Sequence, residues 1–378
     1  MRIGFDLRPF LRQETGVGVY FKNLLFELAR LDKANEYFLF SASWKDRFPQ
    51  DKIPLFDKMR FCDRRWPVKA LNFFWYRFRR PTLDAVFKER LDLTHSPVPL
   101  ILPTRGKKMV TVCDLFFLDF PGKADRDARR HFLKRTGDAL RKADGIVAIS
   151  EFTKNALGRR FSLDPEKIKV THLGLNPLYL ENGDPAAAAE TQRRFGLPDE
   201  YLLFVGASEP RKNIPGLLDA LSIVHRRERK IPLVIAGRPG DDHGNVIARI
   251  RALHLEPSVR LLGYLPERDL RNLYLGATGL VFPSFCEGFG FPLLEAMASG
   301  LPVAASGGSA LAEVGGEAAL YFDPEDADDM AQKMIRLLTD ADLRQSLRTR
   351  GLERSRIFRW AKTAAETLEF YRSVVGSR

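Results

Sequence analysis

Three cysteines in 378 residues and the absence of any long apolar run narrow the class of protein. Cys62, Cys113 and Cys286 lack the spacing of metal ligands, so a reducing compartment is the simplest explanation for them. No stretch of about 18 apolar residues is present, and the first residues lack the basic and apolar segments of a signal peptide. We therefore expect a cytoplasmic protein, either free or held peripherally on the inner face of the plasma membrane.

Internal repeats and low-complexity tracts are also absent, and the composition is that of an ordinary globular protein. Hydrophobic residues make up 45% of the chain and charged residues 29%, which argues against disorder. A chain of this length is too long for one ordinary core, and it predicts two domains of roughly 150–200 residues each.

Short apolar runs alternate with helical patterns along the chain, most clearly in its second half. This alternation predicts parallel sheets with helices on both faces, because strands buried on both faces are apolar throughout. In the second half the expected strands are 201–206, 232–236, 259–262, 279–282, 302–305 and 319–322, with helices at 214–229 and 326–338. In the first half the expected strands are 2–6, 36–42, 108–112 and 145–149, with helices at 17–31, 126–143 and 151–161.

We interpret the pattern as two Rossmann-like, doubly wound α/β domains facing a central cleft. The first covers residues 1–180 and the second 181–359, with the boundary near the turn-rich segment 181–190. Ligands of such sheets bind beyond the carboxyl ends of the strands, so two facing domains are expected to share one cleft.

The net charge of +12 is concentrated in the first half of the chain. Residues 1–180 hold 35 Lys and Arg against 21 Asp and Glu, whereas the rest of the chain holds 25 against 27. A solvated face explains such a surplus, and so does an anionic partner, whether nucleic acid, lipid or an acidic substrate. No RRM, KH or helix-turn-helix pattern is present, so we expect no nucleic acid.

Two segments of the first half combine basic and apolar residues. Residues 64–80, RRWPVKALNFFWYRFRR, interleave six aromatic with six basic residues, and 126–143 form a second basic helix. An amphipathic helix of this composition suits a lipid interface, with arginines at the headgroups and aromatic rings below them. A core helix with charged ends has the same pattern. An anionic membrane surface is therefore one candidate partner for both segments.

Glu287 and Glu295 lie on either side of a glycine-rich, aromatic loop. A proline in the position of a helix first turn and a glycine after the last apolar residues predict a helix over about 292–299. The N-terminus of such a helix attracts anions, and the loop glycines let a ligand approach the main chain closely. Carboxylates beside an anion site suit hydroxyl-rich groups such as a sugar or a ribose.

Arg211 and Lys212 follow an apolar strand that ends at Gly206, and they precede a helix. Two adjacent cations at the carboxyl end of a strand are suited to neutralising a diphosphate. Alone, such a pair is most often solvated. Together with the glutamate-flanked loop, it predicts a site for a phosphorylated ligand that also carries hydroxyl groups.

Four segments closely resemble the retaining glycosyltransferases of family 4, which have the two-Rossmann GT-B architecture: EGFGFPLLEAMASGLPV, GASEPRKN, LLGYLPERDL and TGVGVY. The resemblance runs from Arg2 to the C-terminal FRWAKTAAETLEFYRSV and is nearest to the mannosyltransferase-like members that build O-antigen and other surface polysaccharides. It implies a retaining hexosyltransferase that uses a nucleotide-diphosphate sugar and no cofactor. We see no convincing Asp-x-Asp metal motif, so we expect a metal-independent reaction. GDP-mannose is the first expected donor and a UDP-sugar the second, and the expected acceptor is a glycan or a polyprenyl-diphosphate-linked glycan.

The resemblance also implies roles for individual residues. Glu295 is expected to bind the ribose hydroxyls and Glu287 a hydroxyl of the donor sugar. Arg211 and Lys212 are expected to hold the diphosphate and stabilise it as it leaves. Further donor contacts are expected from Gly16, Gly18, the main chain of Gly288, Phe289, Gly290, Phe291, Pro292 and Leu293, and the backbone near Tyr264. The final helix, residues 360–378, is expected to pack on the first domain.

One departure from the family pattern follows the expected strand 108–112. The family commonly has a His-Asp pair there, whereas this chain has Cys113-Asp114. A thiol with an ordinary pKa is a poor proton shuttle at neutral pH beside an imidazole. Cys113 therefore implies either an altered donor preference with activity intact, which we favour, or a loss of activity. Asp114 remains as a polar group in the cleft.

Glu151 and His95 are candidates for contacts with the acceptor. Glu151 follows Ser150, which is expected to cap a helix, and enzymes of this type use that region near the acceptor. His95 ends a strand and can reach the cleft, although a structural histidine is equally consistent with its position.

Three other functions fit part of the sequence. A catalytically impaired nucleotide-sugar-binding partner or regulatory subunit is favoured by Cys113 and disfavoured by the intact Glu287 and Glu295. A nucleic-acid-binding protein rests on the basic first half alone. A sugar-nucleotide epimerase or an inverting transferase of the same fold is disfavoured by the sequence around the two glutamates.

Overall fold

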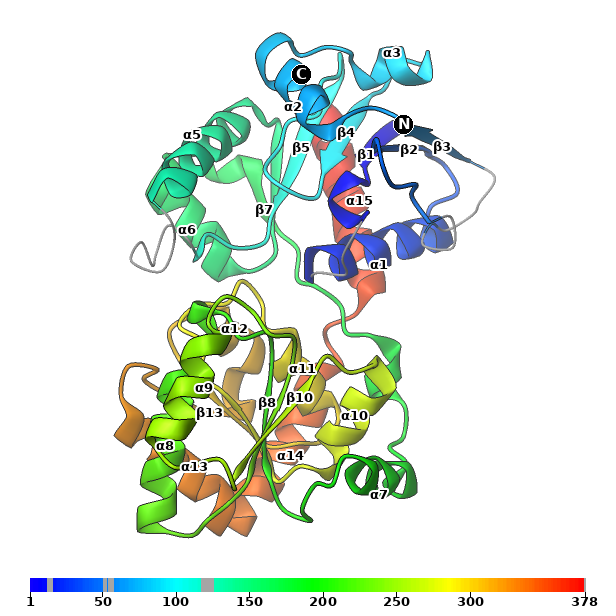
Figure 1. The fold of residues 1–378 in the computed structure, drawn as a ribbon. Coiled ribbons are helices and arrows are strands. Elements are labelled where there is room, and N and C mark those ends of the chain that lie inside the picture. Colours follow the sequence, from blue (N-terminus) through cyan, green and yellow to red (C-terminus); the bar gives the residue numbers. More distant parts are fainter. Residues whose placement is uncertain (12–15, 50–52, 54–57, 117–125, 377–378) are drawn as a thin grey trace. The chain divides into compact units, whose positions relative to one another are not determined.

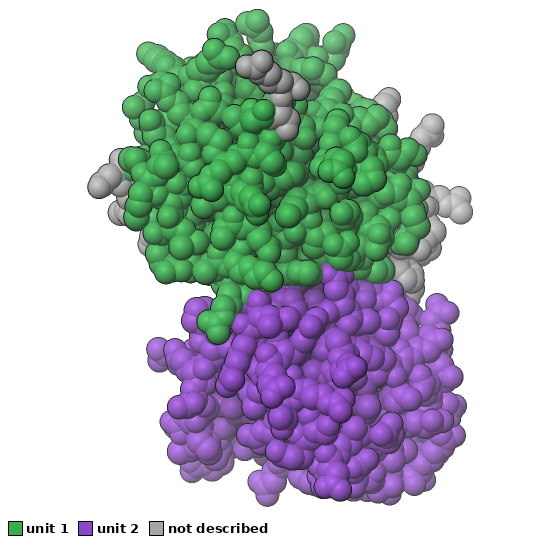
Figure 2. All heavy atoms as spheres, turned by 180° about the vertical axis from the view of Figure 1, so that it is seen from behind, with its two compact units in different colours: residues 1–174, 359–378 green, residues 175–358 purple. Residues whose placement is uncertain are grey.

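The structure, a computed structural model, describes residues 1–11, 16–49, 53, 58–116 and 126–376. The chain forms two compact units, residues 1–174 with 359–378 and residues 175–358, which Figure 2 colours green and purple. The chain passes from one to the other between Gly174 and Leu175, close to the boundary expected at residue 180. The C-terminal helix belongs to the first unit, and its expected last residues, 377 and 378, lie outside the described residues.

A seven-stranded parallel sheet forms the centre of the first unit, in the order β3-β2-β1-β4-β5-β6-β7. The four strands predicted for this half are confirmed as β1, β2, β5 and β6, and the strand that His95 was expected to end is β4. The two edge strands, β3 and β7, were not predicted. An edge strand can leave one side in water, so its residues form no continuous apolar run. The strands are β1 (Arg2–Asp6), β2 (Glu36–Ala42), β3 (Met59–Arg64), β4 (Leu93–Ser96), β5 (Lys107–Val112), β6 (Gly145–Ala148) and β7 (Ile168–Val170).

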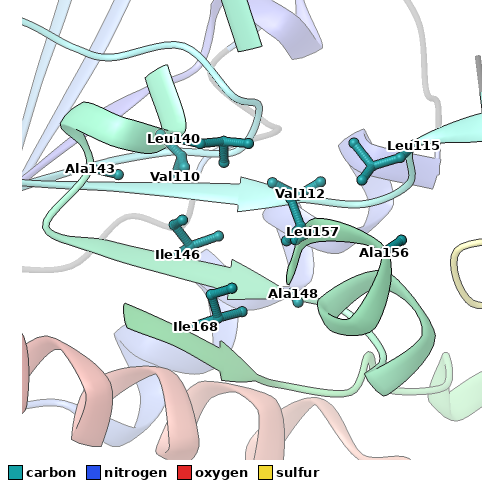
Figure 3. Packing of buried hydrophobic residues seen from close by; sticks show 10 residues of the cluster. All are labelled: Val110, Val112, Leu115, Leu140, Ala143, Ile146, Ala148, Ala156, Leu157 and Ile168. Carbon is teal, nitrogen blue, oxygen red and sulfur yellow. The ribbon is translucent and has the colours of Figure 1, made fainter. Parts of the chain in front are cut away.

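Helices complete the core of the first unit. Val110, Val112 and Ile146 of the sheet pack with Leu140 of α5 and Leu157 of α6, as Figure 3 shows. The helices α1 and α15, the first and last of the chain, pack against each other (Figure 1). The described helices are α1 (Gly16–Leu31), α2 (Val68–Phe78), α3 (Leu83–Phe87), α5 (Arg126–Lys142), α6 (Glu151–Phe161) and α15 (Trp360–Gly376), with short 3-10 turns at Arg8–Phe10 and Pro165–Lys167.

A buried chain of polar groups ties the last helix to the sheet. His95 of β4 is fully buried; its Nδ1 lies 2.6 Å from the Tyr371 hydroxyl of α15, and its Nε2 lies 2.8 Å from Thr111 Oγ1 of β5. The hydroxyl of Tyr20 in α1 lies 3.1 Å from the same Thr111 oxygen. Because buried polar groups are costly unless they are hydrogen-bonded, this chain specifies how α1 and α15 pack on the sheet.

The second unit has a six-stranded parallel sheet in the order β10-β9-β8-β11-β12-β13. All six predicted strands are confirmed: β8 (Leu202–Val205), β9 (Leu233–Ala236), β10 (Val259–Gly263), β11 (Gly279–Phe282), β12 (Val303–Ser306) and β13 (Ala319–Phe322). Their apolar residues made them visible in the sequence, because helices cover both faces of a doubly wound sheet. The edge strand β10 is more exposed, with Arg260 and Leu261 at the surface.

Amphipathic helices surround this second sheet. In α8, buried residues recur every three or four positions, at Ile214, Leu217, Leu218, Leu221 and Val224. The described helices are α7 (Pro185–Arg194), α8 (Ile214–Arg227), α9 (His243–Ala252), α10 (Glu267–Gly276), α11 (Phe291–Ala298), α12 (Ala310–Gly315), α13 (Ala327–Thr339) and α14 (Ala341–Ser355), with 3-10 turns at Pro177–Leu180, Pro210–Lys212 and Gly316–Ala318. Across the residues that the structure describes, no helix has both the length and the apolar content of a membrane span.

The buried His95 predicts a pH-dependent stability of the first unit. Burial lowers the pKa of His95 from 6.5 to about 3, so below pH 6.5 the unfolded chain binds a proton that the folded chain does not. Stability is therefore lost as the pH falls, by up to about 1.4 kcal/mol per pH unit in this range. We expect His95→Gln to remove this contribution. All four tryptophans, Trp44, Trp66, Trp75 and Trp360, lie in the first unit, so urea unfolding followed by tryptophan fluorescence measures it.

The exposed His254 supplies the control for this measurement. His254→Asn keeps a residue type that tolerates the positive φ of 54° at that position, and it should leave the pH slope as in the wild type. Parallel curves for wild type and His95→Gln between about pH 7.5 and 5.5 would contradict the prediction.

Candidate functional site

Glycines at the carboxyl ends of β8 and β9 let these two strand ends pack closely against each other. Gly206 and Gly237 have φ angles of 153° and 157°, a backbone conformation that residues with a side chain rarely adopt. A Cβ atom on Gly237 would lie 1.9 Å from the carbonyl oxygen of Gly206, so the two strand ends approach as closely as backbone allows. Ligands of parallel sheets bind at this edge. Gly237 was not predicted as a site residue, although its place directly after an apolar strand was the available signal.

The glycine-rich loop leads into α11 as predicted. Pro292 lies in the first turn of this helix, and Gly300, with φ 71°, follows its last residues. Gly290 caps the helix with φ 106°, a conformation that favours glycine. The ring of Phe289 is 3% exposed and packs edge-on against Phe291 and Phe358, each 5.6 Å away between ring centroids. The ring of Phe289 therefore belongs to the core, and the loop offers main-chain groups and a helix N-terminus to an anion.

A buried ionic cluster lies between this loop and the end of β8. Glu287 Oε1 accepts a hydrogen bond of 2.6 Å from Lys212 Nζ, and its Oε2 accepts one of 2.9 Å from Arg211. The side chains of Glu287 and Lys212 are 10% and 8% exposed. Arg211 also pairs with Glu209 at 2.8 Å, and Lys212 lies over the ring of Phe282. The structure thus brings together three of the predicted site residues, Arg211, Lys212 and Glu287.

The cluster keeps the carboxylate of Glu287 ionised despite its burial. Burial by itself raises the pKa of Glu287, but Lys212 and Arg211 outweigh this and hold the value at about 2. Burial lowers the pKa of Lys212, and the nearby carboxylate of Glu287 opposes that shift. The result is a pair of fixed cations at a strand end, with their charge balanced by carboxylates.

Glu295 has different surroundings on α11. Its Oε2 accepts a hydrogen bond of 2.9 Å from the hydroxyl of Tyr274, whose ring packs edge-on against Tyr179. Burial raises the pKa of Glu295 to about 7, and the charge of Glu267 adds to this. The two predicted glutamates therefore differ in chemistry, since Glu287 is a permanent anion and Glu295 titrates near neutrality.

Tyr264 lies at the carboxyl end of β10 and is 61% exposed. The guanidinium of Arg238, which follows β9, lies over its ring at 4.6 Å. This pair forms a flat, exposed platform at the same edge of the sheet. Arg238 was not predicted as a site residue, because a single arginine after a strand is indistinguishable from a solvated one in sequence.

The first unit brings Cys113, Asp114 and Glu151 to the ends of β5 and β6. Thr153 Oγ1 donates a hydrogen bond of 3.3 Å to the carbonyl oxygen of Cys113, and Ser150 caps α6 by accepting from the Thr153 N–H, as predicted. Burial raises the pKa of the Cys113 thiol, with the charge of Asp114 adding to the effect. Asp114 and Glu151 are exposed. The ends of β5 and β6 therefore present a neutral thiol and two exposed carboxylates.

Three further predicted residues, Gly16, Gly18 and His95, lie in a helix or in the core. Gly16 and Gly18 belong to the first turn of α1, which begins at Gly16, one residue before the expected start at 17. Their part in phosphate binding stays a prediction. His95 has no exposed surface, and both of its ring nitrogens already have partners, which favours a role in packing over one in acceptor binding.

Comparison with known proteins relates both halves of the chain to sugar transfer. Residues 188–354 match the model of glycosyl transferases group 1, and residues 15–177 match that of glycosyltransferase family 4. The O-antigen chain mannosyltransferase B of Escherichia coli is 31% identical, with 98% of this chain and 100% of that protein aligned. Among solved structures, sucrose-phosphate synthase of Thermosynechococcus elongatus has a TM-score of 0.78 at 20% identity, covering both chains fully. Anabaena HepE, solved with UDP and glucose, has a TM-score of 0.76 at 17% identity, covering 99% of this chain and 100% of HepE.

The ionic cluster predicts a marked loss of stability when its carboxylate is neutralised. Glu287→Gln leaves Lys212 buried beside an uncharged partner, and we expect a loss of about 3–5 kcal/mol in the stability of the second unit. The stability that Glu287 contributes depends on pH, because the pKa of Glu287 is lower in the folded protein than in the unfolded chain. The contribution is present above the unfolded-state pKa of 4.5 and is lost as the pH falls towards 2, so wild type and variant should converge in acid. Urea unfolding followed by far-UV circular dichroism measures the difference.

The matched control removes the buried cation as well. Lys212→Met in the Glu287→Gln background should recover a large part of the lost stability, because no unpaired charge then remains buried. If Glu287→Gln by itself is as stable as the wild type at neutral pH, the cluster is not buried in solution and the prediction is wrong.

Proposed function

The chain belongs to the glycosyltransferases of group 1 and family 4, with the GT-B fold, and we propose that it transfers mannose from a nucleotide-diphosphate sugar with retention of configuration. The observation that carries the proposal is the buried cluster of Arg211, Lys212 and Glu287 beside the N-terminus of α11. Two fixed cations, a helix N-terminus and a glycine-rich main chain suit the diphosphate of the donor.

Each part of the donor has a complementary group in this proposal. Arg211 and Lys212 hold the diphosphate, together with the main chain from Gly288 to Leu293. Glu295 accepts hydrogen bonds from the ribose hydroxyls, and Glu287 accepts one from the sugar. The platform of Tyr264 and Arg238 lies at the strand edge where the base would stack.

Charge stabilisation of the leaving group is the central chemical step. The bond between the anomeric carbon and the diphosphate oxygen breaks, and the acceptor oxygen bonds to the same face of that carbon. The acceptor proton passes to the departing phosphate, so no protein base is needed. Arg211, Lys212 and the dipole of α11 stabilise the negative charge that develops on the diphosphate. These groups provide the charge that a metal ion supplies in other transferases, which supports a metal-independent reaction.

We infer the donor and the acceptor from the relatives, and the location from the cysteines. The mannosyltransferase of E. coli supports mannose as the sugar, and we take GDP-mannose as the first donor to test. HepE, solved with UDP and glucose, supports a UDP-sugar as the second. The name of the same relative, an O-antigen chain mannosyltransferase of E. coli, supports a glycan acceptor, and we propose a polyprenyl diphosphate as its carrier. No disulfide joins the three cysteines, consistent with the cytoplasmic face of the membrane.

A panel of nucleotides tests the donor site directly. We expect GDP to raise the melting temperature of the purified protein more than UDP, ADP or TDP, since ligand at about 100 times its dissociation constant adds roughly 2.7 kcal/mol. The measurement belongs at about pH 8, where Glu295 is ionised, because its pKa is raised to about 7. Below that pKa the affinity should fall by up to tenfold per pH unit.

Glu295→Gln supplies the control for the panel. It keeps the shape of the side chain and should weaken nucleotide binding at about pH 8 while abolishing the pH dependence. The preferred nucleotide is then tested as its sugar conjugate for turnover. A stable shift without any release of nucleotide over time would favour a silent binding partner over an enzyme.

Cys113 is expected to influence the choice of donor. The half-buried thiol has a raised pKa and keeps its proton at neutral pH, so it is not a base, and the reaction as proposed needs none. We expect Cys113→His to change the ratio of kcat/KM between donor sugars by about tenfold or more while leaving the enzyme active. Cys113→Ala, which removes the thiol without adding an imidazole, is the matched control. An inactive but folded Cys113→His variant would contradict this expectation.

A further inference from the structure

A groove of about 650 Å³ opens on the first unit between α2, the segment 97–106 and the second half of α5. Its apolar lining includes Phe73, Trp75 and Tyr76 of α2, with Leu100 and Ile101 opposite. The volume falls within the range of small-molecule sites, roughly 300–1,000 Å³. None of the residues placed in the donor site or at the ends of β5 and β6 lines this groove.

The helix α2 exposes a cluster of aromatic rings beside the groove. One side of the helix, Leu71 and Trp75, is buried in the core. On the remaining surface, Phe73, Phe74, Tyr76 and Phe78 are 60%, 50%, 49% and 54% exposed. The rings of Phe73, Phe74 and Phe78 lie within 6.2 Å of one another, so they form one continuous apolar surface. A patch of this kind on a protein surface marks an interaction site.

Five cations line the same groove: Lys69, Arg79, Lys108, Arg135 and Lys142. Asp138 is the one acidic residue among the described lining, and it already pairs with Arg141 at 2.7 Å. Within the described part of the chain, none of the five cations is paired with a carboxylate. Their mutual repulsion is relieved when an anion binds among them.

We propose that this groove binds the phosphate headgroup of an anionic membrane lipid. The phosphate lies among Lys69, Arg79 and Arg135, and the rings of Phe74 and Phe78 enter the acyl region of the same leaflet. Trp75, which is 3% exposed, contributes an apolar wall to the groove and anchors α2 in the core. The proposal deepens the proposed function, since it rests on an acceptor located at a membrane surface.

Two other occupants fit the groove less well. A second copy of this chain, related by twofold symmetry, would place the five cations of one groove opposite those of the other. A single-stranded nucleic acid needs rings spaced along a basic channel for successive bases. Here the rings of Phe73, Phe74 and Phe78 pack against one another on one helix, and Phe74 and Phe78 do not line the groove. A clustered apolar tip beside a cationic groove matches the two parts of a lipid interface.

Binding of the full-length protein to vesicles tests the proposal. The vesicles contain either phosphatidylcholine alone or phosphatidylcholine with about one-fifth phosphatidylglycerol, which supplies the anionic surface. We expect binding to the anionic vesicles, and a loss of about tenfold or more in affinity for Lys69→Gln/Arg135→Gln. Phe74→Gln/Phe78→Gln should leave a weaker binding that disappears at high salt, because only the electrostatic part remains.

A matched variant separates the groove from net charge. Lys45→Gln/Lys169→Gln removes two exposed cations of the same unit that do not line the groove, and it should change the affinity less than twofold. Equal losses for both pairs would overturn the proposal in favour of diffuse attraction. Dihexanoyl phosphatidic acid should compete with the vesicles, and equal competition by inorganic phosphate would instead indicate a site for free phosphate.

The remaining outcomes are equally distinct. Dimers of the wild type that dissociate in the α2 variants, without vesicle binding, would identify the groove as an interface between copies. Oligonucleotide binding lost in the same variants would identify a nucleic-acid site. Each variant should retain the nucleotide-induced thermal shift, which verifies its fold. If the protein does not bind lipid but keeps its nucleotide-induced thermal shift, the lipid proposal fails and the proposed transferase activity stands. If it binds lipid but shows no nucleotide-induced shift, the proposed transferase activity fails and the lipid site stands.

Discussion

The carboxylate of Glu287 is the group that holds two cations in place at a strand end of the second unit. It is buried with Lys212 and also pairs with the partly exposed Arg211; both cations follow β8 in a different part of the chain. Neither Glu287 nor Lys212 tolerates burial without the other. A buried ion pair adds little stability over an apolar replacement of the same size. The cluster is therefore better explained by its positioning of two cations at a strand end, where a ligand can bind, than by its contribution to stability.

The backbone around this cluster follows the same constraint. Gly206, Gly237 and Gly290 all adopt positive φ angles, and all lie where a strand ends or α11 begins. A side chain at Gly237 would collide with the neighbouring strand end, so the close approach of main chain to main chain depends on glycine. The ring of Phe289 is buried in the core. A surface of main-chain groups beside fixed cations is a good receptor for phosphate.

The two units differ in whether their clustered cations have carboxylate partners. In the second unit, the cations at the strand ends are balanced by carboxylates and held by hydrogen bonds. In the first unit, the cations around the groove beside α2 have no acidic partners among the described residues, and exposed rings accompany them. Balanced, buried charge suits a site that must be specific, whereas unbalanced, exposed charge suits a surface that meets many copies of one anionic group.

The sequence alone determined the fold class, the strands of the second sheet and the bounds of α11, because those elements are encoded by continuous apolar runs and by local turn residues such as Pro292 and Gly300. It also pointed to Glu287, Glu295, Arg211 and Lys212. The edge strands β3 and β7 were missed, since a strand with one side in water carries no continuous apolar run. Only the tertiary structure decided that Glu287 joins the two cations while Glu295 pairs with Tyr274, that Arg238 lies over Tyr264, and that His95 is sealed in the core. The reason is physical: partners of this kind lie tens of residues apart, and burial, which sets the pKa of each group, is a property of the packed chain.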